Sequence, residues 1–146
     1  MEKPQTILEE MHKYFPYDEK DIRSYSSLKL AYLGDAVFEI IIRTLIIERT
    51  GGPVKNLHKK ASALVNAKTQ AELIVVMQEY LTEEELSAFR HGRNAKTSSV
   101  AKHADIHDYR LATGLEALFG YLYMTGQFSR AIELLKLAIQ RLNITL

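Results

Sequence analysis

The sequence predicts an all-α single domain, a helical bundle of about seven helices. The chain has 146 residues with only three prolines, and it contains no long run of strict apolar–polar alternation. Its apolar residues instead recur at the three- and four-residue spacing of a helix face. This length fits one hydrophobic core, so we expect residues 1–146 to form one domain.

Capping residues set the expected helix limits. Ser26 or Ser27 caps the longest helix, and the following Thr-Gly-Gly-Pro run stops it. Thr82 and Glu85 form a capping box, and Ser129 caps the last helix. We expect helices at 4–14, 26–49, 57–65, 68–80, 82–92, 108–125 and 129–143, with a loop at 93–106.

The composition excludes several classes of protein. Without cysteine, the chain has no disulfides, no cysteine-based zinc site and no thiol nucleophile. The N-terminus lacks the basic and apolar regions of a signal peptide, and no uncharged apolar run is long enough for a membrane span. We therefore expect a cytoplasmic protein that does not interact with membranes.

The basic residues are unevenly distributed, although the net charge is only +1. Nine of the 19 basic residues lie in two stretches that contain no acid, 49–71 and 86–104. Local positive patches of this kind suit a polyanion. The alternative is that they are only solvated helix faces.

Three charged residues interrupt the most apolar expected helix. Asp35, Glu39 and Arg43 follow one another at four-residue intervals, so they share one helix face. Glu39 and Arg43 form an intrahelical ion pair by this spacing. Asp35 lies among apolar neighbours and needs a cation, a hydrogen-bond network or a metal, because burial of an unpaired carboxylate is costly.

The sixth expected helix repeats this pattern. It contains Glu116 in apolar surroundings, together with Gly114 and Gly120, which permit close helix contact. Two closely packed helices with one inward acid each would form a hard-oxygen site suited to Mg²⁺. The alternative is that Glu116 pairs with Arg110 or Lys96 and only stabilises the fold.

Two segments carry a resemblance to a known family. LAYLGDAVFE at 30–39 and TGLEALFGYLY at 113–123 resemble the two signature helices of the ribonuclease III catalytic domain. With NLHKKASALVNAKTQAE and GRNAKT between them, the whole chain is similar to the Mini-ribonuclease III family, which lacks the double-stranded-RNA-binding domain. The resemblance implies the ribonuclease III helical fold and a homodimeric, Mg²⁺-dependent endonuclease that cuts double-stranded RNA. It also implies maturation of the 23S ribosomal RNA precursor bound to ribosomal protein L3.

The resemblance places the family's functional acids on this chain. Asp35 and Glu116 match the two signature acids, so they are the expected catalytic residues and metal ligands. Ala31 and Thr113 stand where larger relatives have two more carboxylates, so a single Mg²⁺ completed by waters is the simplest arrangement. Thr113 and Glu39 are expected to act behind the ligands, through water. The two missing acids keep an alternative open, an inactive RNA- or ribosome-binding module on the same fold.

The residues expected to bind the substrate lie in the two basic stretches, 49–71 and 86–104. Their cations would meet phosphates, and Asn94 would bond a 2′-hydroxyl, because proteins recognise double-stranded RNA through these groups. The expected RNA-binding residues are His58, Lys59, Lys60, Arg93, Asn94 and Lys96.

The longest expected helix also supplies the expected dimer interface. Its apolar residues exceed what one face of a small bundle buries. We therefore expect Tyr32, Phe38 and Ile42 to contact a second copy of the chain.

Overall fold

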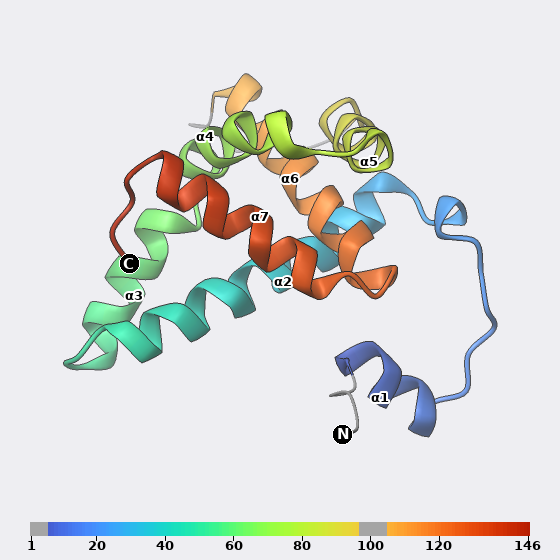
Figure 1. The fold of residues 1–146 in the computed structure, drawn as a ribbon, viewed down its shortest axis with the longest axis horizontal. Coiled ribbons are helices and arrows are strands. Elements are labelled where there is room, and N and C mark those ends of the chain that lie inside the picture. The colour runs from blue at the N-terminus through green and yellow to red at the C-terminus, as the bar shows by residue number, and fades with distance from the viewer. Residues whose placement is uncertain (1–5, 97–104) are drawn as a thin grey trace.

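The computed structural model describes residues 6–96 and 105–146, and it confirms an all-α fold with no strand among these residues. Its α-helices are α1 (Ile7–Tyr14), α2 (Ser27–Arg49), α3 (Val54–Leu64), α4 (Ala67–Met77), α5 (Glu83–Arg93), α6 (Ile106–Met124) and α7 (Phe128–Arg141). Short 3₁₀ helices cover Ile22–Ser24 and Gln78–Tyr80. Figure 1 shows α3 at the far end of α2 from α5.

The predicted caps are confirmed at the starts of α2 and α5. The Ser26 hydroxyl accepts a hydrogen bond from the Lys29 backbone N–H at 3.1 Å. Thr82 and Glu85 bond each other's backbone N–H groups, at 3.2 and 2.9 Å, and so complete the capping box. These two starts are fixed by local chemistry, which is why the sequence predicts them correctly.

Other helix limits differ from the prediction. Ser129 does not cap the last helix, because α7 already includes it. α3 starts directly after Pro53, three residues early, since proline is tolerated at a helix start. α6 also starts early, where the Asp105 side chain caps it. Of the predicted loop at 93–106, residues 97–104 lie outside the described residues.

The backbones of α2 and α6 touch where the two helices cross. A Cβ atom on Gly34 would overlap the backbone oxygen of Glu116 and lie 2.8 Å from the backbone nitrogen of Gly120. A Cβ atom on Gly120 would in turn overlap the backbone oxygen of Leu30. The predicted close helix contact at Gly120 is therefore confirmed. Only glycine permits so close an approach, which brings the middle of α2 against the middle of α6.

The α5 helix packs on the other side of α6 in a similar way. A Cβ atom on Gly114 would lie 2.6 Å from the ring of Phe89, which is fully buried. A Cβ atom on Gly92 would lie 3.1 Å from the backbone oxygen of Thr113. The prediction that Gly114 permits close contact is confirmed, and the C-terminal end of α5 is held against α6.

A buried ion pair connects the start of α5 to α7. Arg130 donates to the Glu85 carboxylate at 3.0 and 3.1 Å and to the backbone oxygen of Tyr80 at 2.7 Å. Burial opposes ionisation of Glu85, but the bonds from Arg130 and from the Thr82 backbone hold its pKa below the ordinary value. This network fixes α5 relative to the core.

The α1 helix differs from the rest because none of its residues is buried. It lies to one side of the body in Figure 1, joined to α2 by an extended segment. In the part of the chain that the structure describes, no helix is both long and apolar enough to cross a membrane.

The helix crossing predicts a large effect of a small substitution. Gly120→Ala should lower the free energy of unfolding by at least about 2 kcal/mol, because the added methyl overlaps a backbone that cannot move aside. This loss should exceed the roughly 1 kcal/mol that alanine gains in helix propensity. Urea denaturation measures the change. Gly51→Ala is the matched control, since nothing lies within 4 Å of its Cβ position; equal stability of the two variants would contradict the prediction.

Candidate active site

The crossing of α2 and α6 brings the carboxyl groups of Asp35 and Glu116 together. The two carboxyl groups lie close enough for a side-chain hydrogen bond with Asp35 to contribute to the raised pKa of Glu116. Asp35 is exposed and Glu116 is half-buried. The prediction that Asp35 is buried is therefore wrong, because α2 turns Val37, Phe38 and Ile41 to the core and leaves Asp35 outside. Asp35 has a partner, as expected, but that partner is another acid.

Glu116 is the electrostatically perturbed member of the pair. Burial raises its pKa to about 8, and the hydrogen bond and negative charge of Asp35 and the charge of Glu39 act in the same direction. The protonated form of Glu116 is therefore favoured near neutral pH, beside the carboxyl group of Asp35. Among the described residues no ion pair joins Glu116 to Arg110 or Lys96, so the structural alternative for Glu116 finds no support.

Glu39 and Arg43 form the ion pair that their spacing predicts. The Arg43 guanidinium donates to the Glu39 carboxylate at 3.3 Å. The charge of Glu39 also reaches Glu116, so Glu39 belongs to the same negatively charged surface. The ion pair therefore places a cation beside the acids, although the sequence interpretation gave Arg43 only a structural role.

The two positions without family carboxylates are both buried. Ala31 lies one turn before Asp35 and is 7% exposed. Thr113 lies one turn before Glu116, is equally buried, and donates its hydroxyl to the backbone oxygen of Tyr109 at 2.9 Å. This bond lies within α6, so the hydroxyl proton of Thr113 is used by its own helix. Neither position adds a ligand to the acidic pair.

The donor set of the acidic pair fits a hard divalent cation. Carboxylate oxygens are the ligands that Mg²⁺ prefers, and Mg²⁺ is often held by one or two carboxylates and several waters. Burial and the negative charges of Asp35 and Glu39 raise the pKa of Glu116, and a cation at this position would offset these charges. Within residues 6–96 and 105–146, no group of three or more acids, histidines or cysteines converges at ligating distance.

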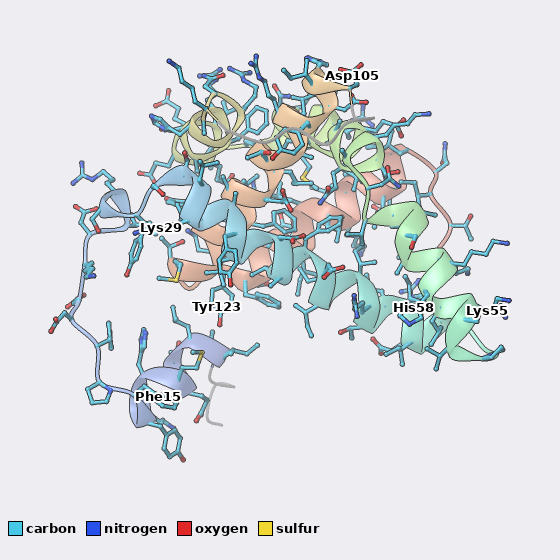
Figure 2. All side chains as sticks on the ribbon, turned by 180° about the vertical axis from the view of Figure 1, so that it is seen from behind. Phe15, Lys29, Lys55, His58, Asp105 and Tyr123 are labelled. Atoms are coloured by element: carbon cyan, nitrogen blue, oxygen red, sulfur yellow. The ribbon has the colours of Figure 1, made fainter. Side chains whose placement is uncertain are left out.

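The predicted RNA-binding residues of α3 are exposed but point in different directions. Successive helical residues turn by about 100°, so His58, Lys59 and Lys60 spread around α3. Lys60 faces Glu72 and the C-terminal residues. Figure 2 shows His58 and Lys55 beyond the C-terminal end of α2, with Lys29 near the other end of that helix. The α3 residues are thus separated from the acidic pair by much of the length of α2.

The other predicted RNA-binding residues lie at the end of α5. The Arg93 guanidinium stacks over the ring of Phe89 at 5.4 Å and donates to the Asn94 side chain at 3.1 Å. Asn94 and Lys96 are exposed. Because α5 packs on α6, this group lies on the other side of the molecule from α3 (Figure 1). A single chain therefore presents two separated basic groups.

The predicted dimer interface needs a correction. Phe38 and Ile42 are fully buried within one chain, so they are not available to a second copy. Their side chains fill the core between α2 and α6, where the rings of Phe38 and Phe119 lie 5.8 Å apart. Tyr32 is 85% exposed and stays a candidate. Sequence patterns identify the apolar residues of α2 but do not tell its core face from its outer face.

Glu116 predicts a pH dependence of stability. Its pKa rises from an ordinary 4.5 to about 8 on folding, so the folded state binds more protons between these values. The contribution of Glu116 to the stability of the metal-free protein should be fully present below about pH 4.5. It should be lost as pH rises through about 8. The melting temperature of Glu116→Gln, measured in chelator from pH 5 to 9, should therefore rise relative to that of the original chain. A constant difference would contradict the prediction.

Comparison with known proteins identifies the family of this fold and site. Residues 28–127 match the model of the ribonuclease III domain. This range contains Asp35, Glu116 and the helix crossing that joins them. A crystal structure of a Fusobacterium nucleatum protein has the same fold, with a TM-score of 0.73 and 32% sequence identity over 84% of this chain and 94% of that one.

Curated relatives cover most of the chain. Mini-ribonuclease 3 of Clostridium tetani is 45% identical over 133 residues, which are 88% of this chain and 88% of that protein. Mini-ribonuclease 3 of Thermoanaerobacter is 44% identical over 82% of this chain and 84% of its own length. The relative from Enterococcus faecalis is 42% identical over 86% of this chain and 97% of its own length. The chain therefore belongs to the ribonuclease III family, within its Mini-ribonuclease 3 group, and is an endoribonuclease.

Proposed function

We propose that this endoribonuclease cuts double-stranded RNA with Mg²⁺ held by Asp35 and Glu116, and leaves 5′-phosphate and 3′-hydroxyl ends. The observation that carries the proposal is the pair of acids that the glycine crossing brings together from two helices, where the pKa of Glu116 is raised. Two carboxyl groups forced together in this way cost the fold stability. A divalent cation at this position offsets that cost.

The residues of the pair have different tasks. Asp35, exposed at the surface of α2, reaches a substrate without any movement of the backbone. Glu116 would hold the cation from the half-buried side, in place of the proton that its raised pKa favours. Bound Mg²⁺ supplies a water of lowered pKa and stabilises negative charge on the scissile phosphate. No side chain forms a covalent intermediate in this scheme.

Glu39 and Thr113 act behind the ligands in this proposal. Glu39 is one helical turn from Asp35 and orients water near the cation through its second carboxylate oxygen, while its first oxygen holds Arg43. Thr113 already donates its proton within α6, so its hydroxyl oxygen is left to accept a hydrogen bond from water. Ala31 has no side-chain oxygen or nitrogen that could bind a cation. The proposed site therefore holds one cation rather than two.

RNA binding is proposed for the two basic groups. At one end of the molecule, RNA phosphates would bind the α3 residues His58 and Lys59, with Lys60 on the flank of that helix. At the other end they would bind Arg93, Asn94 and Lys96. Contacts to phosphate make affinity depend steeply on salt, because counterions are released from the RNA. The separation of the groups suits a duplex better than a short single strand.

A homodimer is proposed on the outer face of α2. Two large apolar side chains are exposed near its N-terminal end, one helical turn apart: Leu28 and Tyr32. A contiguous exposed apolar surface marks an interaction site. A twofold dimer would also double the basic groups and supply one acidic pair for each strand.

The biological substrate proposed is the 23S ribosomal RNA precursor in the cytoplasm. The family membership and the length of the match support this proposal. Ribosomal protein L3 is the proposed partner that presents the precursor. Residues 1–146 are proposed to act as one catalytic domain.

Loss of one carboxylate tests the site. Asp35→Asn should lower cleavage of a long RNA duplex in Mg²⁺ by at least about 100-fold, because loss of the cation removes several kcal/mol of transition-state stabilisation. Glu48→Gln, a change of an exposed acid on the same helix, should leave the rate unaltered. Gel analysis of the products over time measures both. Cutting that survives in Asp35→Asn would overturn the site, and duplex binding without cutting in the original chain would favour the inactive RNA-binding module.

The dimer face has its own test. Tyr32→Lys should shift the protein from dimer to monomer in sedimentation velocity, because it places two charges in the apolar contact. Its melting temperature as a monomer should change little, since Tyr32 contacts almost nothing within its own chain. Val75→Lys, at an exposed apolar position on α4, is the control. If the original chain is a monomer, or Tyr32→Lys stays a dimer, the proposed face is wrong.

A further inference from the structure

Arg43 occupies a special position relative to the acidic pair. It lies eight residues after Asp35, which on an α-helix is about 12 Å along the axis and only about 80° around it. Its guanidinium lies over the turn of Glu39, as the 3.3 Å hydrogen bond to that carboxylate shows. This direction is the usual one, because helical side chains lean toward the N-terminus. The cation of Arg43 is thus brought toward Asp35.

The ion pair that holds Arg43 is weak. Both side chains are largely open to water, with 57% of Arg43 and 36% of Glu39 exposed. Exposed pairs at this spacing contribute only about 0.3–0.5 kcal/mol. A partner that offers two oxygens to the planar guanidinium would replace Glu39 easily, and phosphate is such a partner.

A polyanion that approaches this surface needs a cation beside the acids. Asp35 and Glu39 would both repel a phosphate backbone. Arg43 lies on the side of these acids that faces α3, because α3 follows directly on the C-terminal end of α2 (Figure 2). An RNA strand that runs from the acidic pair to the basic residues of α3 therefore passes Arg43.

We propose that Arg43 exchanges Glu39 for an RNA phosphate beside the scissile one, and so holds the cut strand along α2. This inference rests on the proposed function. Arg43 is then a substrate-binding residue, and Glu39 holds its guanidinium in place in the absence of RNA. The exchange also releases the Glu39 carboxylate next to the cation when the substrate arrives.

The test measures duplex binding without cleavage. The background is Asp35→Asn, and the probe is a fluorescent RNA duplex of defined sequence titrated over a series of NaCl concentrations. Adding Arg43→Gln should weaken binding roughly tenfold and reduce the slope of log affinity against log salt by about 1, the value for one lost phosphate contact. Lys13→Gln, which breaks an exposed intrahelical ion pair with Glu10 on α1, is the matched control and should leave the slope unchanged.

A second substitution separates this exchange from a simple change of net charge. Glu39→Gln frees Arg43, so it should tighten duplex binding in the Asp35→Asn background. The gain should disappear when Arg43→Gln is also present, because it acts through the freed guanidinium. A gain of equal size in both backgrounds would show a general charge effect and overturn the exchange.

The remaining outcomes are also decisive. Unchanged affinity and slope in Arg43→Gln would show that the ion pair only stabilises α2. Loss of the dimer in that variant, by sedimentation velocity, would make Arg43 an interface residue and overturn its assignment to RNA. Failure of the Asp35→Asn protein to bind the duplex at all would overturn the proposed function together with this inference. If the duplex binds normally and Arg43→Gln leaves the salt slope unchanged, only this inference is overturned and the proposed function stands.

Discussion

The backbones of α2 and α6 touch at Gly34 and Gly120, and the position of every other functional group depends on this contact. A side chain at either glycine would separate the helices. Separation would move Asp35 away from Glu116, because each acid lies beside the crossing. The same contact turns the apolar residues of α2 into the core, where Phe38 meets Phe119. Fold and site therefore share one constraint.

The adjacent carboxyl groups of Asp35 and Glu116 destabilise the folded state electrostatically, and the interactions of the rest of the fold offset this effect. Glu116 is held with a raised pKa next to another carboxyl group, in a position that water only partly reaches. Such a group weakens the folded state when it ionises. Glu85, in contrast, is paired with Arg130. Among the residues that the structure describes, no basic side chain forms an ion pair with Glu116.

The positive groups are arranged around this negative centre rather than in it. α3 lies beyond one end of α2, and the end of α5 lies on the other side of the molecule (Figure 1). Between them Arg43 is held by Glu39 beside the acids. The basic groups of α3 and α5 are therefore separate from the acidic pair, whereas Arg43 lies beside it.

The sequence by itself determined the features that depend on near neighbours in the chain. These are the helical class, the caps at Ser26 and Thr82, the ion pair of Glu39 with Arg43, and the motif acids Asp35 and Glu116. Only the tertiary structure decided which side of α2 is buried, and so it placed Asp35 outside and Phe38 and Ile42 inside. Helical periodicity spreads apolar residues around so apolar a helix, and only the packing partner selects the buried side. The raised pKa of Glu116 beside Asp35 is likewise a property of two distant segments, and no local pattern contains it.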